Sequence, residues 1–125
     1  MKKALWTGAK VAEAPYTPGV QVGAMVFVSG QVPLDPATKQ LVAGEFEDRV
    51  RQCLANVAAV LKEAGADLSH VVKTTVFLTD LDQFARMNAV YKQHFGEVRP
   101  ARSCIQVCRL PMCADVEIEA IAVVP

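Results

Sequence analysis

Short runs of β-branched and aromatic residues, bounded by glycine, proline or aspartate, recur along most of the chain. Such runs are typical of strands, because branched side chains pack well on a pleated surface. Val71–Leu78 is the clearest of them, and Gly23 breaks an earlier run into a hairpin-like pair. We predict strands at 20–28, with Ser29–Gln31 ending this stretch, and at 71–78, 101–109 and 115–123, with an optional short strand near Leu5.

Two segments have the longer apolar period of a helix. The first stripe comprises Phe46, Val50, Leu54, Val57, Leu61 and Ala64, with Gly65 placed to end the helix. The second comprises Phe84, Met87, Tyr91 and Phe95, with Asp80 and Asp82 as possible N-caps and Gly96 as the stop. The order β-β-α-β-α-β-β predicts an α+β fold in which one mixed sheet carries two helices, in a single domain over residues 1–125.

The predicted sheet has apolar residues on both faces. In its last strand, one face carries Val116, Ile118, Ala120 and Ala122, and the other carries Glu117, Glu119, Ile121 and Val123. Two helices cover only one face of such a sheet, so the other face needs a partner surface. We therefore expect an oligomer in which the uncovered faces pack together.

Composition and charge narrow the class of protein. The hydrophobic fraction is 52%, which excludes a disordered chain. Thirteen basic residues balance thirteen acidic ones, so the basic excess typical of nucleic-acid binding is absent. No apolar stretch near the start is long enough for a secretory signal or a membrane anchor. We expect a cytoplasmic protein with no membrane association, and a mitochondrial pool remains an open alternative.

The four cysteines do not form a metal-binding pattern. Cys53, Cys104, Cys108 and Cys113 include no CxxC pair and have no histidine at ligand spacing. We interpret them as buried thiols, because free cysteine behaves as a small apolar residue in a reducing compartment. Phosphate-binding glycine loops are also missing from the sequence.

Charged residues inside predicted strands are the main candidates for chemistry. Arg102 begins a strand after Pro100, and its planar fork could hold a substrate carboxylate. Glu117 and Glu119 alternate with apolar residues, and a half-buried carboxylate is costly unless it is paired or catalytic. Arg102 could equally neutralise one of these glutamates in a structural ion pair, and the sequence pattern does not choose between the two.

Two further residues allow a functional and a structural interpretation. Cys104 shares the face of Arg102, so it is either a small buried residue or a nucleophile whose thiolate the arginine stabilises. Tyr16 lies in a loop stiffened by Pro15 and Pro18, where it either packs against the fold or closes a site.

Several segments together resemble the RidA (YjgF-type) family of small imine deaminases, historically labelled L-PSP endoribonucleases. The combination of Pro-Ala-Arg-Ser with Glu-Ile-Glu-Ala is the most specific part of the resemblance. The matching segments run in the family's order: Ala14–Tyr16, Val26–Asp35, Val71–Leu78, Phe84–Tyr91, Arg99–Cys104 and Val116–Ala122. The chain departs from the family pattern around Tyr16, where Ala14 and Thr17 replace glycine and serine and Pro18 follows.

The resemblance implies a chorismate-mutase-like protomer in a homotrimer, with sites at the subunit interfaces. It implies that Arg102 grips the substrate carboxylate, that Glu117 holds the attacking water and that Tyr16 closes the pocket. The backbone around Gly30 and Cys104 would contact the substrate, and Asn88 matches an asparagine near the site. All residue numbers are those of this sequence.

The implied activity is hydrolysis of reactive 2-imino or 2-enamino acids, such as 2-iminobutanoate and 2-iminopropanoate, to 2-oxo acids and ammonia. An iminium carbon is already electrophilic, so this chemistry needs neither a metal nor an organic cofactor. Two alternatives stay open from the sequence. One is an endoribonuclease or translation inhibitor, which the balanced charge disfavours. The other is a non-enzymatic protein that binds small carboxylates or unfolded protein at its apolar surfaces.

Overall fold

In the computed structural model, which describes residues 1–125, strand β6 (Val116–Val123) lies inside a six-stranded mixed sheet. The strand order is β1-β2-β3-β6-β4-β5, and every neighbouring pair is antiparallel except β4 and β5. The other strands are β1 (Lys3–Leu5), β2 (Gly19–Val22), β3 (Met25–Gln31), β4 (Val71–Leu78) and β5 (Ala101–Gln106). The expected strand near Leu5 is present as β1.

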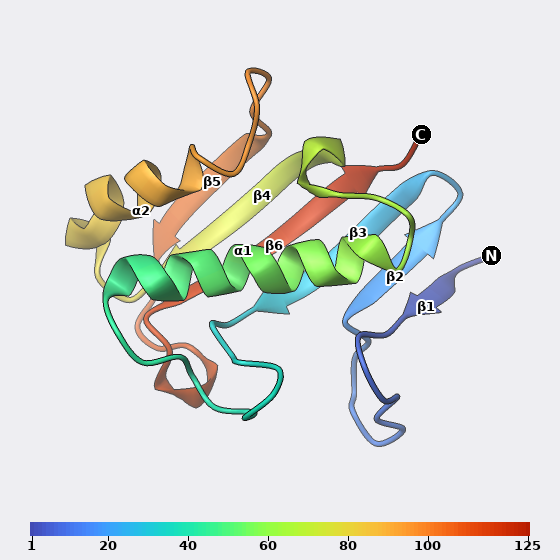
Figure 1. The fold of residues 1–125 in the computed structure, drawn as a ribbon, viewed down its shortest axis with the longest axis horizontal. Helices are drawn as coiled ribbons and strands as arrows, with labels where there is room; N and C mark the ends of the chain where they lie inside the picture. Colours follow the sequence, from blue (N-terminus) through green and yellow to red (C-terminus); the bar gives the residue numbers. More distant parts are fainter.

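Two α-helices, α1 (Phe46–Lys62) and α2 (Phe84–Tyr91), lie across one face of the sheet (Figure 1). Three single-turn helices connect the larger elements: η1 (Leu68–His70), η2 (Leu81–Gln83) and η3 (Pro111–Cys113). The predicted fold class, one mixed sheet with two helices on one face, is confirmed. No helix combines the length and the apolar character needed to cross a membrane.

Local sequence explains why α1 forms where it does. The Asp48 carboxylate accepts the backbone N–H of Glu45 at 3.0 Å, which satisfies a donor at the start of the helix. Acidic residues in the first turn and Lys62 in the last complement the helix dipole. Gly65 adopts a positive φ of 72°, the left-handed conformation expected after a helix.

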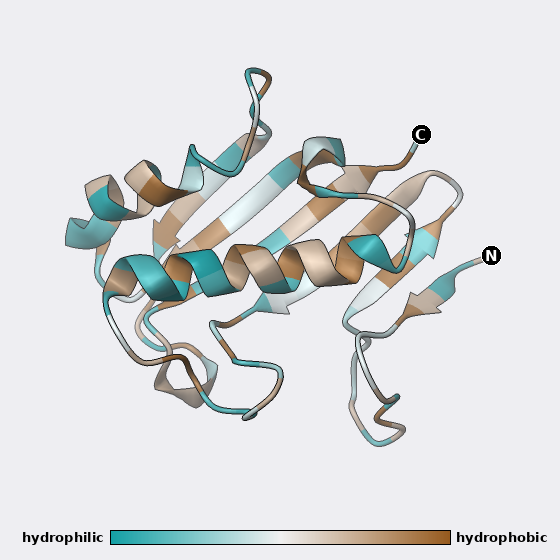
Figure 2. Cartoon of the chain, viewed as in Figure 1, coloured by the Kyte–Doolittle hydropathy of each residue, from teal (hydrophilic) through white to brown (hydrophobic).

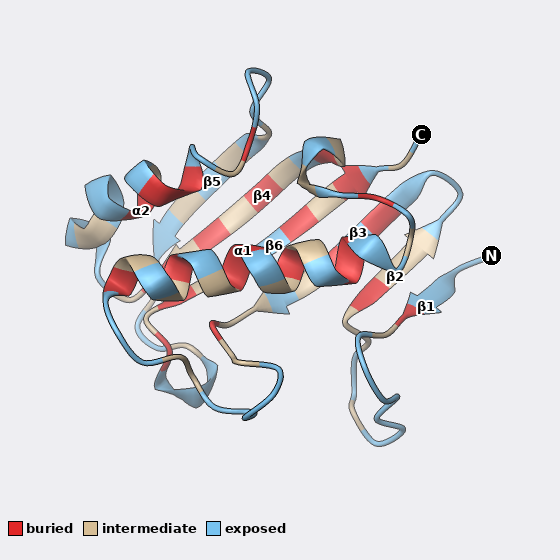
Figure 3. Cartoon of the chain, in the orientation of Figure 1, coloured by how far each residue is buried: buried red, intermediate tan, exposed pale blue.

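The core lies between the helices and the sheet. Figure 3 shows buried residues recurring along α1, and Figure 2 shows its most polar residues towards its two ends. The predicted stripe of α1 is buried except for Ala64, which packs against the edge of the core. In β6 the buried residues are Val116, Ile118, Ala120 and Ala122, as their alternation predicted.

The helix-free face of the sheet is the face that neither helix covers. Its apolar side chains remain exposed in the single chain: Val22, Met25, Phe27, Ile105 and Val123 are each between 41% and 46% exposed. Strand register places them on one face, since Val22 pairs with Met25, Met25 with Val123, and Phe27 with Ile121. The predicted two-sided apolar sheet is therefore confirmed.

Three predicted element boundaries were wrong by three residues or more. β5 ends at Gln106 rather than at residue 109, because its partner β4 ends opposite, at Leu78. β3 continues through Gln31, because β6 still pairs with it there through Ile118. α2 ends at Tyr91, although Phe95 still packs on the Tyr91 ring with a centroid distance of 4.7 Å.

The expectation of four buried thiols was also wrong. Cys53 is buried and Cys104 is half-buried, but Cys108 and Cys113 are exposed. Both exposed cysteines lie beyond the true end of β5, in the connection to β6, where no element of the core covers them.

Candidate functional site

Arg102 lies at the start of β5, directly opposite Thr74 of β4, and its side chain reaches α2. Its Nη1 donates to Asn88 Oδ1 at 2.8 Å. The guanidinium lies over the rings of Tyr91 and Phe84, 4.8 and 5.4 Å from their centroids. Stacking and the hydrogen bond together fix the plane of the guanidinium and leave other N–H donors free.

No carboxylate pairs with Arg102. The ion pairs of the molecule involve Arg49, Arg51, Arg86 and His70, and none reaches residue 102. The alternative of a structural ion pair between Arg102 and Glu117 or Glu119 is therefore wrong. A half-buried, oriented and unpaired guanidinium is suited to bind a carboxylate from a ligand.

Cys104 lies two residues further along the same face as Arg102 and is half-buried against the core. Burial raises the pKa of its thiol, and the charge of Arg102 only partly opposes this effect. The thiol is therefore protonated at neutral pH. This state disfavours the alternative in which Cys104 acts as a nucleophile, since the thiolate is the reactive form.

Glu117 occupies the helix-free face of β6, opposite Phe77 of β4. Partial burial raises the pKa of its carboxyl group, and the nearby charge of Glu119 raises it further. No hydrogen bond within the chain stabilises its charged form. A carboxyl group with a raised pKa is suited to take up and return a proton near neutral pH.

Gly30 lies beside Glu117 at a β-bulge. Between two paired positions β3 advances from Val28 to Gln31, three residues, while β6 advances only from Ala120 to Ile118. A Cβ at position 30 would lie 2.8 Å from Glu117 Cδ and would collide with Oε2. Only glycine therefore lets the Glu117 carboxyl group rest against the backbone here.

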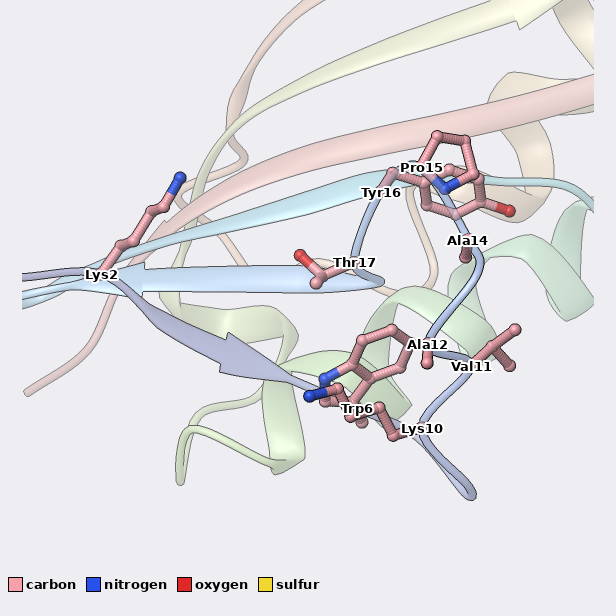
Figure 4. Close-up of a pocket in the computed structure, with 9 residues that line it drawn as sticks. All are labelled: Lys2, Trp6, Lys10, Val11, Ala12, Ala14, Pro15, Tyr16 and Thr17. Carbon is pink, nitrogen blue, oxygen red and sulfur yellow. The ribbon is translucent and has the colours of Figure 1, made fainter.

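Tyr16 is 65% exposed in a loop that is tied to the same bulge. Ser29 Oγ donates to the Thr17 carbonyl at 2.6 Å, and the Ser29 N–H donates to the Pro18 carbonyl at 2.9 Å. The loop borders an open cavity of about 360 Å³, lined by Lys2, Trp6, Lys10, Val11, Ala12, Ala14, Pro15, Tyr16 and Thr17. Figure 4 shows Pro15 and Tyr16 on one side of this cavity and Trp6 with Lys10 on the other.

The six predicted site residues thus form two groups, which one chain does not bring together. The clamp half comprises Arg102, Asn88 and Cys104, on the helix side of the sheet near its β5 edge. The water half comprises Glu117, Gly30 and Tyr16, around the β3 bulge and the helix-free face. The sheet itself separates Arg102 from Glu117, because they extend from opposite faces and their strands have β4 between them.

Sequence reasoning missed the aromatic platform beneath Arg102. It assigned Phe84 and Tyr91 to the buried stripe of the second helix, but Phe84 is 40% exposed. The available signal was helical spacing, since Phe84, Asn88 and Tyr91 are four and three residues apart and therefore share one face. The same helix borders a second cavity, of about 330 Å³, lined by Asn88, Tyr91, Lys92, Arg99, Pro100 and Arg102.

The distribution of metal-binding side chains gives no candidate metal centre. No group of three histidine, cysteine, aspartate or glutamate side chains lies close enough together to hold an ion. The two halves offer an unpaired guanidinium, that of Arg102, and a partly buried carboxyl group with a raised pKa, that of Glu117.

Comparison with known proteins matches the chain to one family. Residues 7–124 match the family model described as Endoribonuclease L-PSP. A mouse protein named 2-iminobutanoate/2-iminopropanoate deaminase is 47% identical over 117 residues, covering 94% of this chain and 87% of its own.

Solved structures share the fold over almost the full length. The crystal structure of Escherichia coli TdcF with bound serine has a TM-score of 0.89 at 45% identity, covering 98% of this chain and 99% of that one. RidA from the Antarctic bacterium Psychrobacter sp. has a TM-score of 0.90 at 39% identity, covering 98% and 99% of the two chains.

Proposed function

Because the chain belongs to the endoribonuclease L-PSP family, which includes the RidA-type imine deaminases, we propose that it hydrolyses 2-imino acids to 2-oxo acids and ammonia. The observation that carries this proposal is the unpaired guanidinium of Arg102, held by Asn88 and the two rings of α2. It offers a fixed cation for the carboxylate that all such substrates have in common. The serine bound to TdcF is likewise a small amino acid with a carboxylate.

The reaction assigns one role to each half of the site. Arg102 binds the substrate carboxylate through two N–H groups and so fixes the position of the imine carbon. Glu117 accepts a proton from a water molecule, whose oxygen adds to that carbon. Glu117 then gives this proton to the nitrogen. As the C–N bond breaks, the proton of the added hydroxyl group returns to Glu117, the carbonyl of the 2-oxo acid forms and ammonia leaves. The raised pKa of Glu117 supports this role, because the group must exchange protons in both directions.

A homotrimer would unite the two halves. Arg102 and Glu117 lie on opposite faces of their own sheet, so one chain cannot place both against the same small substrate. The helix-free face is apolar and exposed in the single chain, which supports its burial against another copy. We place the site where the clamp half of one protomer meets the water half of its partner, with Gly30 and Cys104 offering backbone contacts and Tyr16 closing the pocket.

The name of the mouse relative supports small imino acids with apolar side chains as one group of substrates. Its name specifies 2-iminobutanoate and 2-iminopropanoate, and it is 47% identical to this chain. Each of these substrates has one carboxylate and a short apolar side chain. Binding by Arg102 requires only the carboxylate.

The deciding experiment measures release of 2-oxo acid from an imine generated freshly in solution, with and without the protein. We expect the protein to accelerate hydrolysis of 2-iminopropanoate, and Arg102→Ala to abolish most of the acceleration. A protein that binds carboxylates but leaves the rate of hydrolysis unchanged would support the non-enzymatic alternative instead.

A further inference from the structure

The cavity beside Arg102 contains more positive charge than a single carboxylate needs. It has a volume of about 330 Å³, and three of its six lining residues are the cations Lys92, Arg99 and Arg102. No acidic side chain lines it. Arg102 alone is sufficient for the carboxylate that defines the proposed substrates, so Lys92 and Arg99 have no part in the mechanism described above.

None of the three cations forms an ion pair within the chain. Three arginines elsewhere are paired, Arg49 with Asp115, Arg51 with Asp48 and Arg86 with Glu47. Neither Lys92 nor Arg99 forms an ion pair, and Glu97, the acidic residue nearest to them in sequence, lies outside the cavity lining. In a chain whose total charge is zero, this is a local positive excess in a concave surface, which concentrates anions.

Local structure gives Arg99 a defined position relative to Arg102. Lys92 follows the last residue of α2, where a positive charge is explained in part by the helix dipole. That explanation does not apply to Arg99, which lies in the connection to β5. Pro100 restricts the residue before it to an extended backbone, and three residues span at most about 10 Å. Arg99 and Arg102 therefore border one cavity from a short, stiffened segment.

We propose that this cavity binds the second carboxylate of a dianionic substrate, so that the chain prefers 2-imino dicarboxylates to imino acids with apolar side chains. The inference rests on the proposed deaminase function and names its substrate class. Arg102 holds the carboxylate next to the imine carbon, and Arg99 holds the side-chain carboxylate through its planar fork, with Lys92 adding a point charge. Water adds to the imine carbon, the C–N bond breaks, and a 2-oxo dicarboxylate and ammonia result without any redox change.

The test compares two imines generated in solution by amino acid oxidases, one from aspartate and one from alanine. We expect kcat/KM to be at least about tenfold higher for the imine of aspartate. Arg99→Gln should reduce that ratio on the order of tenfold, as expected for one charge-assisted contact. The matched control is Arg109→Gln, since Arg109 is also exposed and unpaired but lies outside the cavity, and it should leave the ratio unchanged.

The outcomes separate this inference from the proposed function. If wild type and Arg99→Gln both hydrolyse the imine of alanine, the deaminase function stands. If they also have the same ratio of kcat/KM for the two imines, the dicarboxylate preference is overturned. If neither imine is hydrolysed, thermal stabilisation by succinate and by propanoate tests the cavity directly. Stronger stabilisation by succinate that disappears in Arg99→Gln would support the second anion site, and equal stabilisation by the two acids would overturn it.

Discussion

The hydroxyl groups of Thr74 and Tyr91 share a buried 2.7 Å hydrogen bond beneath the guanidinium of Arg102. Thr74 is also the residue directly opposite Arg102 in the sheet. The strand that aligns the backbone of Arg102 therefore also holds the ring on which its side chain rests. This arrangement explains how an arginine without a carboxylate partner keeps one orientation.

A double-mutant cycle tests this relationship. Thr74→Val and Tyr91→Phe each leave one buried hydroxyl without a partner, so each should lower the free energy of unfolding by about 1–3 kcal/mol. The double variant should cost less than the sum, because it leaves no unpaired hydroxyl. Denaturant unfolding gives the free energy of unfolding of wild type, the two single variants and the double variant. If the two single losses add up to the loss in the double variant, the two hydroxyl groups are not coupled.

Arg102 variants distinguish charge from geometry. Arg102→Ala should reduce kcat/KM for imine hydrolysis on the order of a hundredfold or more, because the charged contact and the substrate's orientation are lost together. Arg102→Lys should fail to restore activity, since an ammonium group lacks the planar fork. Stability should change little, because no buried carboxylate loses its partner. Full activity in a folded Arg102→Ala trimer would falsify the proposed mechanism.

The raised pKa of Glu117 gives a pH dependence with a definite sign. If the carboxylate accepts a proton from water, kcat/KM should fall as pH decreases through the pKa of Glu117, which lies above the ordinary value of 4.5. Glu117→Gln should remove both the activity and this acidic limb. A wild-type profile that keeps its full rate below pH 4.5 would contradict the role of Glu117 as base.

The raised pKa of Glu117 also affects stability, and here the pH dependence is opposite to that of activity. The folded chain holds the Glu117 proton more tightly than the unfolded chain, so the stabilising effect is complete below the unfolded pKa and is lost as pH rises through the folded pKa. Glu117→Gln should therefore unfold at a temperature equal to or above that of wild type at pH 7, and this difference should shrink in acid. Calorimetry at pH 7 and pH 4 checks both statements.

Gly30→Ala tests the close approach at the bulge. The added methyl group would displace the Glu117 carboxyl group, a flexible side-chain end, so activity should fall about tenfold to a hundredfold with only a modest loss of stability. Gly96→Ala is the matched control, because no atom lies within 4 Å of a Cβ at that position. Equal activity of the two variants in the imine assay would separate Gly30 from the site.

The helix-free face predicts the oligomeric state. Light scattering should give a homotrimer, and Phe27→Asp should shift it towards monomer, because a carboxylate there would be buried in the interface. Leu81→Asp is the control, since Leu81 is 42% exposed, almost as much as Phe27 at 41%, but lies in η2 away from this face. A monodisperse wild-type monomer would remove the interface model of the site.

The sequence predicted the layers of the fold better than the geometry of the site. Periodicity alone reports which side of a strand is buried, so the alternation in β6 and the stripe of α1 were correct. The end of β5 depends on where β4 ends, and that information lies some thirty residues away in the chain. Phe84 has the spacing of a core residue, but its place at the start of α2 leaves it beneath Arg102 rather than beneath the sheet.

The two halves of the site show a second limit of sequence reasoning. Alternation could place Arg102 and Cys104 on one face, and Glu117 and Glu119 on one face. It could not show that these faces are opposite ones, because that depends on register across β4. The contact of Gly30 with Glu117 depends on a bulge, which shifts one strand by one residue and leaves no periodic signal.

The central position of β6 also has a consequence for synthesis. β3 and β4 both pair with β6 and not with each other. Because β6 comes after all the other helices and strands in the chain, β3 and β4 each have an unpaired edge until the ribosome has made β6. Unpaired edges of apolar strands invite association with other chains, and pairing over such sequence distances is slow. The sheet therefore assembles late, and the edges of β3 and β4 are open to association with other chains until residues 116–123 pair with both.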